Sequence, residues 1–85
     1  MSRSLDELKI RAAPALSASG EFRKKLIEIA ATKSPSAAFD LAEATARNHG
    51  HTLNEALAVA KGVRWLAVIK RDYGEEELQK VTEEK

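Results

Sequence analysis

Cysteine is absent from this 85-residue chain. The sequence therefore provides no disulfide framework, no thiolate nucleophile and no cysteine ligand for zinc. Long apolar runs are also missing, because no stretch approaches the roughly 18 apolar residues of a membrane span. Residues 1–9 carry charges where a signal peptide needs an apolar core. We therefore expect a cytoplasmic protein without a membrane partner.

Aromatic residues are few, and they are Phe22, Phe39, Trp65 and Tyr73. Much of the apolar content is alanine instead, which predicts helices that approach one another closely. A ligand cavity of roughly 300 Å³ or more is hard to enclose with so few large side chains. We therefore expect no enzyme and no bound cofactor.

Charge of one sign is not in excess either, because 14 basic residues stand against 13 acidic residues and the net charge is +1. This balance lacks the basic excess that is typical of nucleic-acid-binding domains. The acidic residues nevertheless gather near the C-terminus, at Glu75, Glu76, Glu77, Glu83 and Glu84. We interpret this group as a solvent-facing end of the chain.

The segment from Thr52 to Tyr73 has the strongest helical pattern, and we expect the other helices to pack around it. Thr52 and Glu55 have the spacing of a capping box, in which each side chain accepts a hydrogen bond from the other residue's backbone N–H. Gly74 suits a left-handed helix end. The apolar residues recur in two neighbouring rows, namely Leu53, Leu57, Ala60 and Val63, and Ala56, Val59, Val63 and Leu66. Two rows predict a helix that is covered from more than one side.

Shorter helices are predicted before this segment. Ser4 can cap a first helix, which Pro14 should shorten or kink near residues 11–13 because proline lacks a backbone N–H. A second helix is expected over about residues 21–32 and a third over residues 36–48, from the spacing of their apolar residues. No segment alternates in the manner of a β-strand.

Turn residues fix the limits of the third helix and suggest short connections. Ser34 suits its N-cap, Pro35 suits its first turn, and Gly50 suits the turn that follows it. Together these patterns predict an all-α fold, a small antiparallel bundle of four helices over residues 1–74. Residues 75–85 should form a charged tail or a short fifth helix that frays or docks onto a partner.

His49 and His51 flank a glycine and invite a metal interpretation. A structural or catalytic zinc site needs a third or fourth ligand, and only carboxylates at unknown distance are available. We therefore favour two surface histidines in a turn over a metal site. The serines are explained by capping, and the sequence has no Gly-x-Ser-x-Gly element for a nucleophile.

Nucleic-acid binding is the alternative function. Residues 36–48 and 52–73 have the order of a helix-turn-helix, and basic side chains that could contact phosphates are Arg47, Lys61, Arg64, Lys70 and Arg71. The second of these helices is too apolar to leave a free face for reading bases, and the net charge is near zero. We therefore rank this alternative below protein binding.

Trp65, Ile69 and Tyr73 follow one another at intervals of four residues. Large apolar residues at this spacing usually pack inward, so the core is one interpretation. The other is a surface for a partner, since aromatic residues are enriched at interface hot spots. In that case Arg64 and Lys61 form its polar rim.

The run from residue 21 to residue 57 resembles the nitrogen-fixation-associated leader-peptide domain family. The matching positions are Lys25-Leu26, Leu41-Ala42, Gly50, Leu53 and Glu55. The resemblance implies a small helical domain that either precedes a ribosomally made peptide and is held by the modifying enzyme, or stands alone. No Gly-Gly cleavage site precedes a short core peptide here, so we do not expect a peptide precursor.

The sequence thus predicts a non-enzymatic interaction module, an adaptor, regulator or accessory subunit. Its partner would be another protein or a second copy of the chain. The residues expected to bind it are Trp65, Ile69, Tyr73, Arg64 and Lys61.

Overall fold

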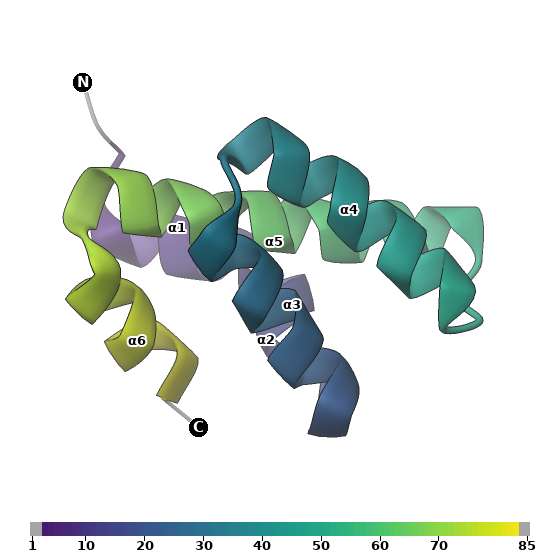
Figure 1. The fold of residues 1–85 in the computed structure, drawn as a ribbon. Coiled ribbons are helices and arrows are strands. Elements are labelled where there is room, and N and C mark those ends of the chain that lie inside the picture. Colours follow the sequence, from purple (N-terminus) through teal and green to yellow (C-terminus); the bar gives the residue numbers. More distant parts are fainter. Residues whose placement is uncertain (1–2, 84–85) are drawn as a thin grey trace.

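The computed structural model describes residues 3–83, and within this range every regular element is a helix (Figure 1). The helices are α1 (Leu5–Arg11), α2 (Ala13–Leu16), α3 (Gly20–Thr32), α4 (Pro35–Asn48), α5 (Leu53–Tyr73) and α6 (Glu75–Glu83). The all-α prediction is therefore confirmed. The described residues form six helices where the sequence predicted four and a short fifth.

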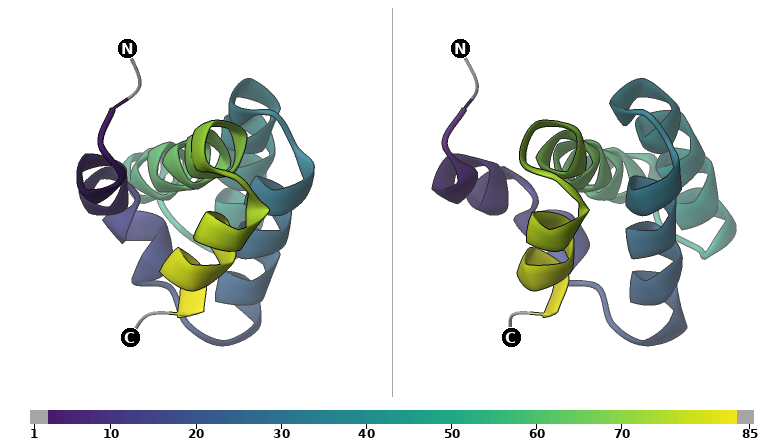
Figure 2. Two further views of the ribbon diagram at one scale, coloured as in Figure 1. Left: turned by 90° about the vertical axis from the view of Figure 1, so that its left-hand side faces the viewer. Right: turned by 60° about the vertical axis from the view of Figure 1, so that its left-hand side comes forward.

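The long helix α5 forms the centre of the fold. All five other helices pack against it, with α1 on one side and α4 on the other, and α6 crossing near its C-terminal end (Figure 2). Nine of its residues are buried: Ala56, Val59, Ala60, Gly62, Val63, Leu66, Ala67, Val68 and Ile69. A helix with two apolar rows must be covered on more than one side, which explains this central position.

Local sequence signals set the helix limits. The Thr52 hydroxyl accepts a hydrogen bond from the Glu55 N–H at 3.2 Å, and a Glu55 carboxylate oxygen accepts from the Thr52 N–H at 2.8 Å. Both bonds of the capping box are thus formed. The Ser34 side chain likewise caps α4. Gly50 and Gly74 have φ of 103° and 97°, so glycine allows the turns that end α4 and α5.

The first predicted helix is divided in two. α1 ends at Arg11, and α2 begins at Ala13 with Pro14 at its second position. Proline has no N–H to continue the ladder of the preceding helix but fits the first turn of a new one. The expected antiparallel four-helix bundle is not confirmed, because α3 and α6 run steeply across α5 whereas α4 lies alongside it (Figure 1).

Small residues allow the backbones to approach closely. Ala38, Ala42 and Ala46 on α4 have no exposed surface. On α5, a methyl group built on Gly62 would lie 2.7 Å from the Ala15 nitrogen and 2.9 Å from the Ala15 Cβ. The backbone of α2 therefore rests directly on α5, at a position where any side chain would intrude.

The C-terminal helix packs against its own chain rather than fraying or waiting for a partner. Leu78 and Val81 of α6 are only 3% and 2% exposed. The Arg23 guanidinium on α3 donates to the Thr82 carbonyl and so fastens the end of α6. The predicted short helix of the tail is present, but the expectation that it frays or docks onto a partner is wrong, because its two apolar residues pack into the core. Residues 84–85 of that tail lie outside the described residues.

We predict that Gly62→Ala destabilises the fold. The added methyl group meets backbone atoms of α2, which cannot move aside as a flexible side chain would. The overpacking cost should lie near the upper end of about 1–3 kcal/mol, against roughly 1 kcal/mol gained from better helix propensity. Urea unfolding followed by circular dichroism measures the net loss.

The matched control is Ala44→Ser, at an exposed position within α4. It should change the free energy of unfolding by no more than about 0.5 kcal/mol. A Gly62→Ala chain as stable as the wild type would show that α2 does not lie so close to α5.

We also predict a pH-dependent contribution from the capping box. The hydrogen bond from the Thr52 backbone N–H, helped by the Thr52 side chain, lowers the pKa of the Glu55 carboxyl below its ordinary value. A carboxyl with a lower pKa in the folded chain stabilises the fold above its ordinary pKa, and this stabilisation is lost as the pH falls through the lowered value. Glu55→Gln removes the titration but keeps an acceptor oxygen.

Wild type should therefore be more stable than Glu55→Gln at pH 7, and the difference should shrink as the pH is brought from 7 down through the lowered pKa of the Glu55 carboxyl. Urea midpoints across this range measure it. A difference that stays constant with pH would contradict the assignment.

Candidate functional site

The five residues predicted to bind a partner separate into a surface group and a core residue. Ile69 has no exposed surface, so it belongs to the core and not to a binding surface. Trp65 is half-buried, Tyr73 is 37% exposed, and Lys61 and Arg64 are exposed. The indole is thus neither sealed in the core nor fully in solvent.

The geometry of the helix explains this separation. Four residues advance an α-helix by about 40° more than one full turn. Residues at intervals of four therefore wind slowly around α5, and Ile69 turns into the core while Trp65 stays at its edge. The straight row of the sequence is not a straight row on the surface.

Three guanidinium groups surround the Trp65 ring. The central carbons of Arg64, Arg11 and Arg3 lie 5.1, 5.2 and 5.3 Å from the ring centroid. At this distance each cation is attracted by the negative face of the aromatic ring. Arg64 comes from α5 itself, whereas the other two come from the start of the chain.

The N-terminal segment is held in position by three further contacts. Glu7 pairs with Arg3 at 3.2 Å and with Arg11 at 3.9 Å. The Tyr73 hydroxyl donates a hydrogen bond to the Arg3 carbonyl. Tyr73 therefore acts by fixing Arg3 beside Trp65, and its ring need not meet a partner.

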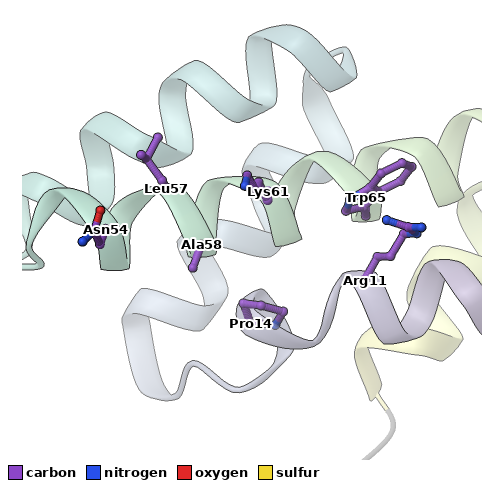
Figure 3. Close-up of a pocket in the computed structure, with 7 residues that line it drawn as sticks. All are labelled: Arg11, Pro14, Asn54, Leu57, Ala58, Lys61 and Trp65. Carbon is purple, nitrogen blue, oxygen red and sulfur yellow. The ribbon is translucent and has the colours of Figure 1, made fainter.

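A hollow of about 450 Å³ opens beside the indole, between α1 and α2 on one side and α5 on the other (Figure 3). Its lining residues are Arg11, Pro14, Asn54, Leu57, Ala58, Lys61 and Trp65. This volume is larger than the roughly 300 Å³ that the scarcity of aromatic residues led us to consider hard to enclose. The difference arises because the hollow is an open depression between helices and needs no complete wall. Its charged lining residues, Arg11 and Lys61, are both basic.

We call the surface formed by Arg3, Arg11, Lys61, Arg64 and Trp65, together with the hollow, the Trp65 face. The sequence indicated its α5 residues but not the two N-terminal arginines. Arg3, Glu7 and Arg11 do have the spacing of one helix face, so their mutual proximity could have been found. The sequence alone does not indicate that Arg3 and Arg11 contact Trp65, because this depends on how α1 packs against α5.

His49 and His51 pack against a third ring. The Phe22 centroid lies 4.4 Å from the His49 ring and 5.2 Å from the His51 ring, in stacked arrangements. Within residues 3–83 no group of three or more His, Asp or Glu side chains is placed to hold a metal ion. The rings also border a hollow of about 370 Å³. Their evident role is to join the turn after α4 to the start of α3.

The basic residues considered for nucleic acid are not gathered on one surface. Lys61 and Arg64 belong to the Trp65 face, but Lys70 donates to the Ala31 carbonyl at the end of α3. Arg71 pairs with Asp72, and Arg47 lies 3.9 Å from Glu43. α5 buries nine residues against the other helices, and its exposed edge carries apolar residues such as Leu53 and Ala58 beside the basic ones, unlike the polar face of a recognition helix.

No protein-family model, curated protein or solved structure matches this chain. The resemblance of residues 21–57 to the leader-peptide domain therefore stays a prediction. None of the helices in residues 3–83 combines the length and apolar character needed to cross a membrane.

The single tryptophan makes the Trp65 face directly measurable. Cations around a half-buried indole should draw an anionic quencher toward it and repel a cationic one. We predict that iodide quenches the fluorescence more strongly than caesium does at equal ionic strength. Arg11→Gln should narrow the difference, because it removes one of the three guanidinium groups.

Lys24→Gln is the control, since Lys24 is an exposed residue of α3 paired with Glu21. It removes the same charge and should leave the ratio of the two quenching constants unchanged. Equal quenching by both ions in the wild type would mean that the arginines do not surround the indole in solution.

Proposed function

We propose that this protein is a non-enzymatic interaction module that binds a segment of another protein through the Trp65 face. The observation that carries the proposal is a half-buried surface indole enclosed by three guanidinium groups, beside an open hollow with leucine and proline in its lining. Tryptophan and arginine are the residue types most enriched at interface hot spots.

The arrangement also lowers the entropic cost of binding. A free arginine side chain loses considerable rotamer freedom when it is fixed by a partner. Here Arg3 and Arg11 already rest on the indole and share Glu7, so part of this freedom is lost before binding. A preordered surface of this kind suits recognition.

The lining of the hollow argues for binding rather than catalysis. It contains no histidine, carboxylate, serine or cysteine, and Lys61, its one side chain that could serve as a nucleophile or general base, has no partner of these types in the lining. Arginine and lysine at its rim suit the recognition of negatively charged groups. We therefore assign the face to an adaptor, regulator or accessory subunit.

Nucleic-acid binding is a second candidate because the Trp65 face carries four basic residues, Arg3, Arg11, Lys61 and Arg64. Contacts with phosphates would make binding fall steeply with salt. The apolar residues Leu53, Leu57 and Ala58 on the exposed edge of α5 favour backbone contact over base reading. Retention on heparin, lost with rising salt and absent in the variants below, would favour this candidate over the first.

The proposal predicts that capture of a protein partner depends on the Trp65 face. In pull-downs from extract of the cells that make the protein, Arg64→Glu and Trp65→Ala should lose partners that the wild type retains. Lys24→Glu on α3 makes the same change in charge as Arg64→Glu and should retain them. Light scattering of the isolated chain shows whether it associates with itself, in which case the captured partner would be a second copy.

Thermal unfolding accompanies each pull-down. If Trp65→Ala lowers the melting temperature and leaves capture intact, the indole serves the fold alone and the proposal fails.

A further inference from the structure

The Trp65 face is chemically different at its two ends. Leu53, Leu57, Lys61 and Trp65 follow one another at intervals of four along α5. Leu53 is 51% exposed and Leu57 is half-buried, so this end of the row offers apolar surface. Figure 3 shows Leu57 and Ala58 at one end of the hollow and the Arg11 side chain reaching the Trp65 ring at the other. Apolar and basic side chains therefore lie toward opposite ends of the face, along a row that winds by about 120° around α5 between Leu53 and Trp65.

We propose that the occupant is an acidic amphipathic peptide segment of another protein, with apolar side chains toward Leu53 and Leu57 and carboxylates toward Arg11, Lys61 and Arg64. This inference rests on the proposed function and specifies its partner. The residues from Leu53 to Trp65 span about 18 Å of helix. That length matches a helical segment of roughly 12 residues, or about five to six residues in an extended conformation.

The basic end has donors left for a carboxylate. No hydrogen bond or ion pair of the described residues engages the Lys61 ammonium, and Arg64 contacts only the indole. Arg11 lies 3.9 Å from Glu7, which is longer than a direct charge-assisted hydrogen bond of about 2.7–2.9 Å. A guanidinium that rests on a ring still presents the N–H groups of its outer edge, which suit bidentate contact with a carboxylate.

The acidic helix of a second copy would satisfy only half of this surface. The acidic helix α6 exposes Glu75, Glu76 and Glu83, which could reach the basic end. Its apolar residues Leu78 and Val81 are buried in its own core, so it has nothing to place on Leu53 and Leu57. A second copy that docks through α6 therefore offers charge complementarity without apolar complementarity, because the exposed apolar residues Ile10 and Leu41 lie on α1 and α4 and not on the acidic helix.

Nucleic acid also satisfies the surface incompletely. Phosphates could contact the basic end, but the Trp65 ring is already covered by guanidinium groups and leaves little room for a base to stack. The exposed leucines would stay uncovered. A segment that carries both carboxylates and apolar side chains meets both ends at once.

The test uses the full chain and three synthetic peptides of roughly 12 residues that lack tryptophan. The first has leucines at one end and glutamates at the other, the second replaces glutamate by lysine, and the third scrambles the first. Anisotropy of a label on the peptide measures affinity, and Trp65 fluorescence reports contact at the face. We expect the first peptide to bind at least about tenfold more tightly than either of the others.

Charge exchange makes the test specific to the face. The double variant Arg11→Glu/Arg64→Glu should no longer bind the glutamate peptide and should bind the lysine peptide instead. The control Lys24→Glu/Lys25→Glu makes the same change in net charge on α3 and should still prefer the glutamate peptide. Leu57→Ser should weaken the glutamate peptide without reversing the preference. If circular dichroism shows that the double glutamate variant is unfolded, Arg11→Gln/Arg64→Gln should abolish the preference for acid.

Any of three outcomes would overturn the inference. The scrambled peptide could bind as tightly as the first peptide, or the Lys24→Glu/Lys25→Glu control could lose the first peptide to the same extent as Arg11→Glu/Arg64→Glu. The third outcome is a chain that binds only a second copy of itself or only heparin. If none of the peptides binds but capture of a partner from extract still depends on the Trp65 face, this inference is overturned and the proposed function stands. If capture from extract does not depend on the Trp65 face, both this inference and the proposed function are overturned.

Discussion

The close contact of α2 with α5 at Gly62 is the constraint on which the arrangement of this protein depends. The Ala15 backbone lies where a side chain on Gly62 would be, and alanines of α4 meet α5 on another side. Small residues let helices approach closely, so that each pair gains dispersion contacts along its length. The same closeness leaves no room for an indole inside, which keeps Trp65 at the edge of the core.

This contact also determines where the candidate site is. Because α2 is fixed on α5 and only Ala12 separates it from α1, α1 must lie along the same side of α5. The arginines at its ends then reach the indole, and the Tyr73 hydroxyl holds the Arg3 carbonyl. The site is therefore a product of packing in the first quarter of the chain, although its centre lies on α5.

The proposed binding of an acidic segment follows from charge that is unevenly distributed rather than from net charge. The overall charge of +1 hides a basic face at α1 and α5 and an acidic helix α6. The buried Leu78 and Val81, together with the hydrogen bond from Arg23 to the Thr82 carbonyl, hold α6 against the core, so its carboxylates do not fold over the Trp65 face. In this proposal, the Trp65 face selects acidic segments because the basic residues on it are kept apart from the acidic residues of α6.

The sequence by itself determined the helices and their limits, because caps, glycines and Pro14 act through bonds between residues only a few positions apart. It also indicated that residues 52–73 form the central helix, since its two apolar rows need cover. Only the tertiary structure decided that Ile69 is core, that α6 docks on its own chain, and that Arg3 and Arg11 meet Trp65. The Tyr73–Arg3 bond joins residues 70 positions apart, and contacts at such separations depend on how the helices cross, which no local pattern encodes.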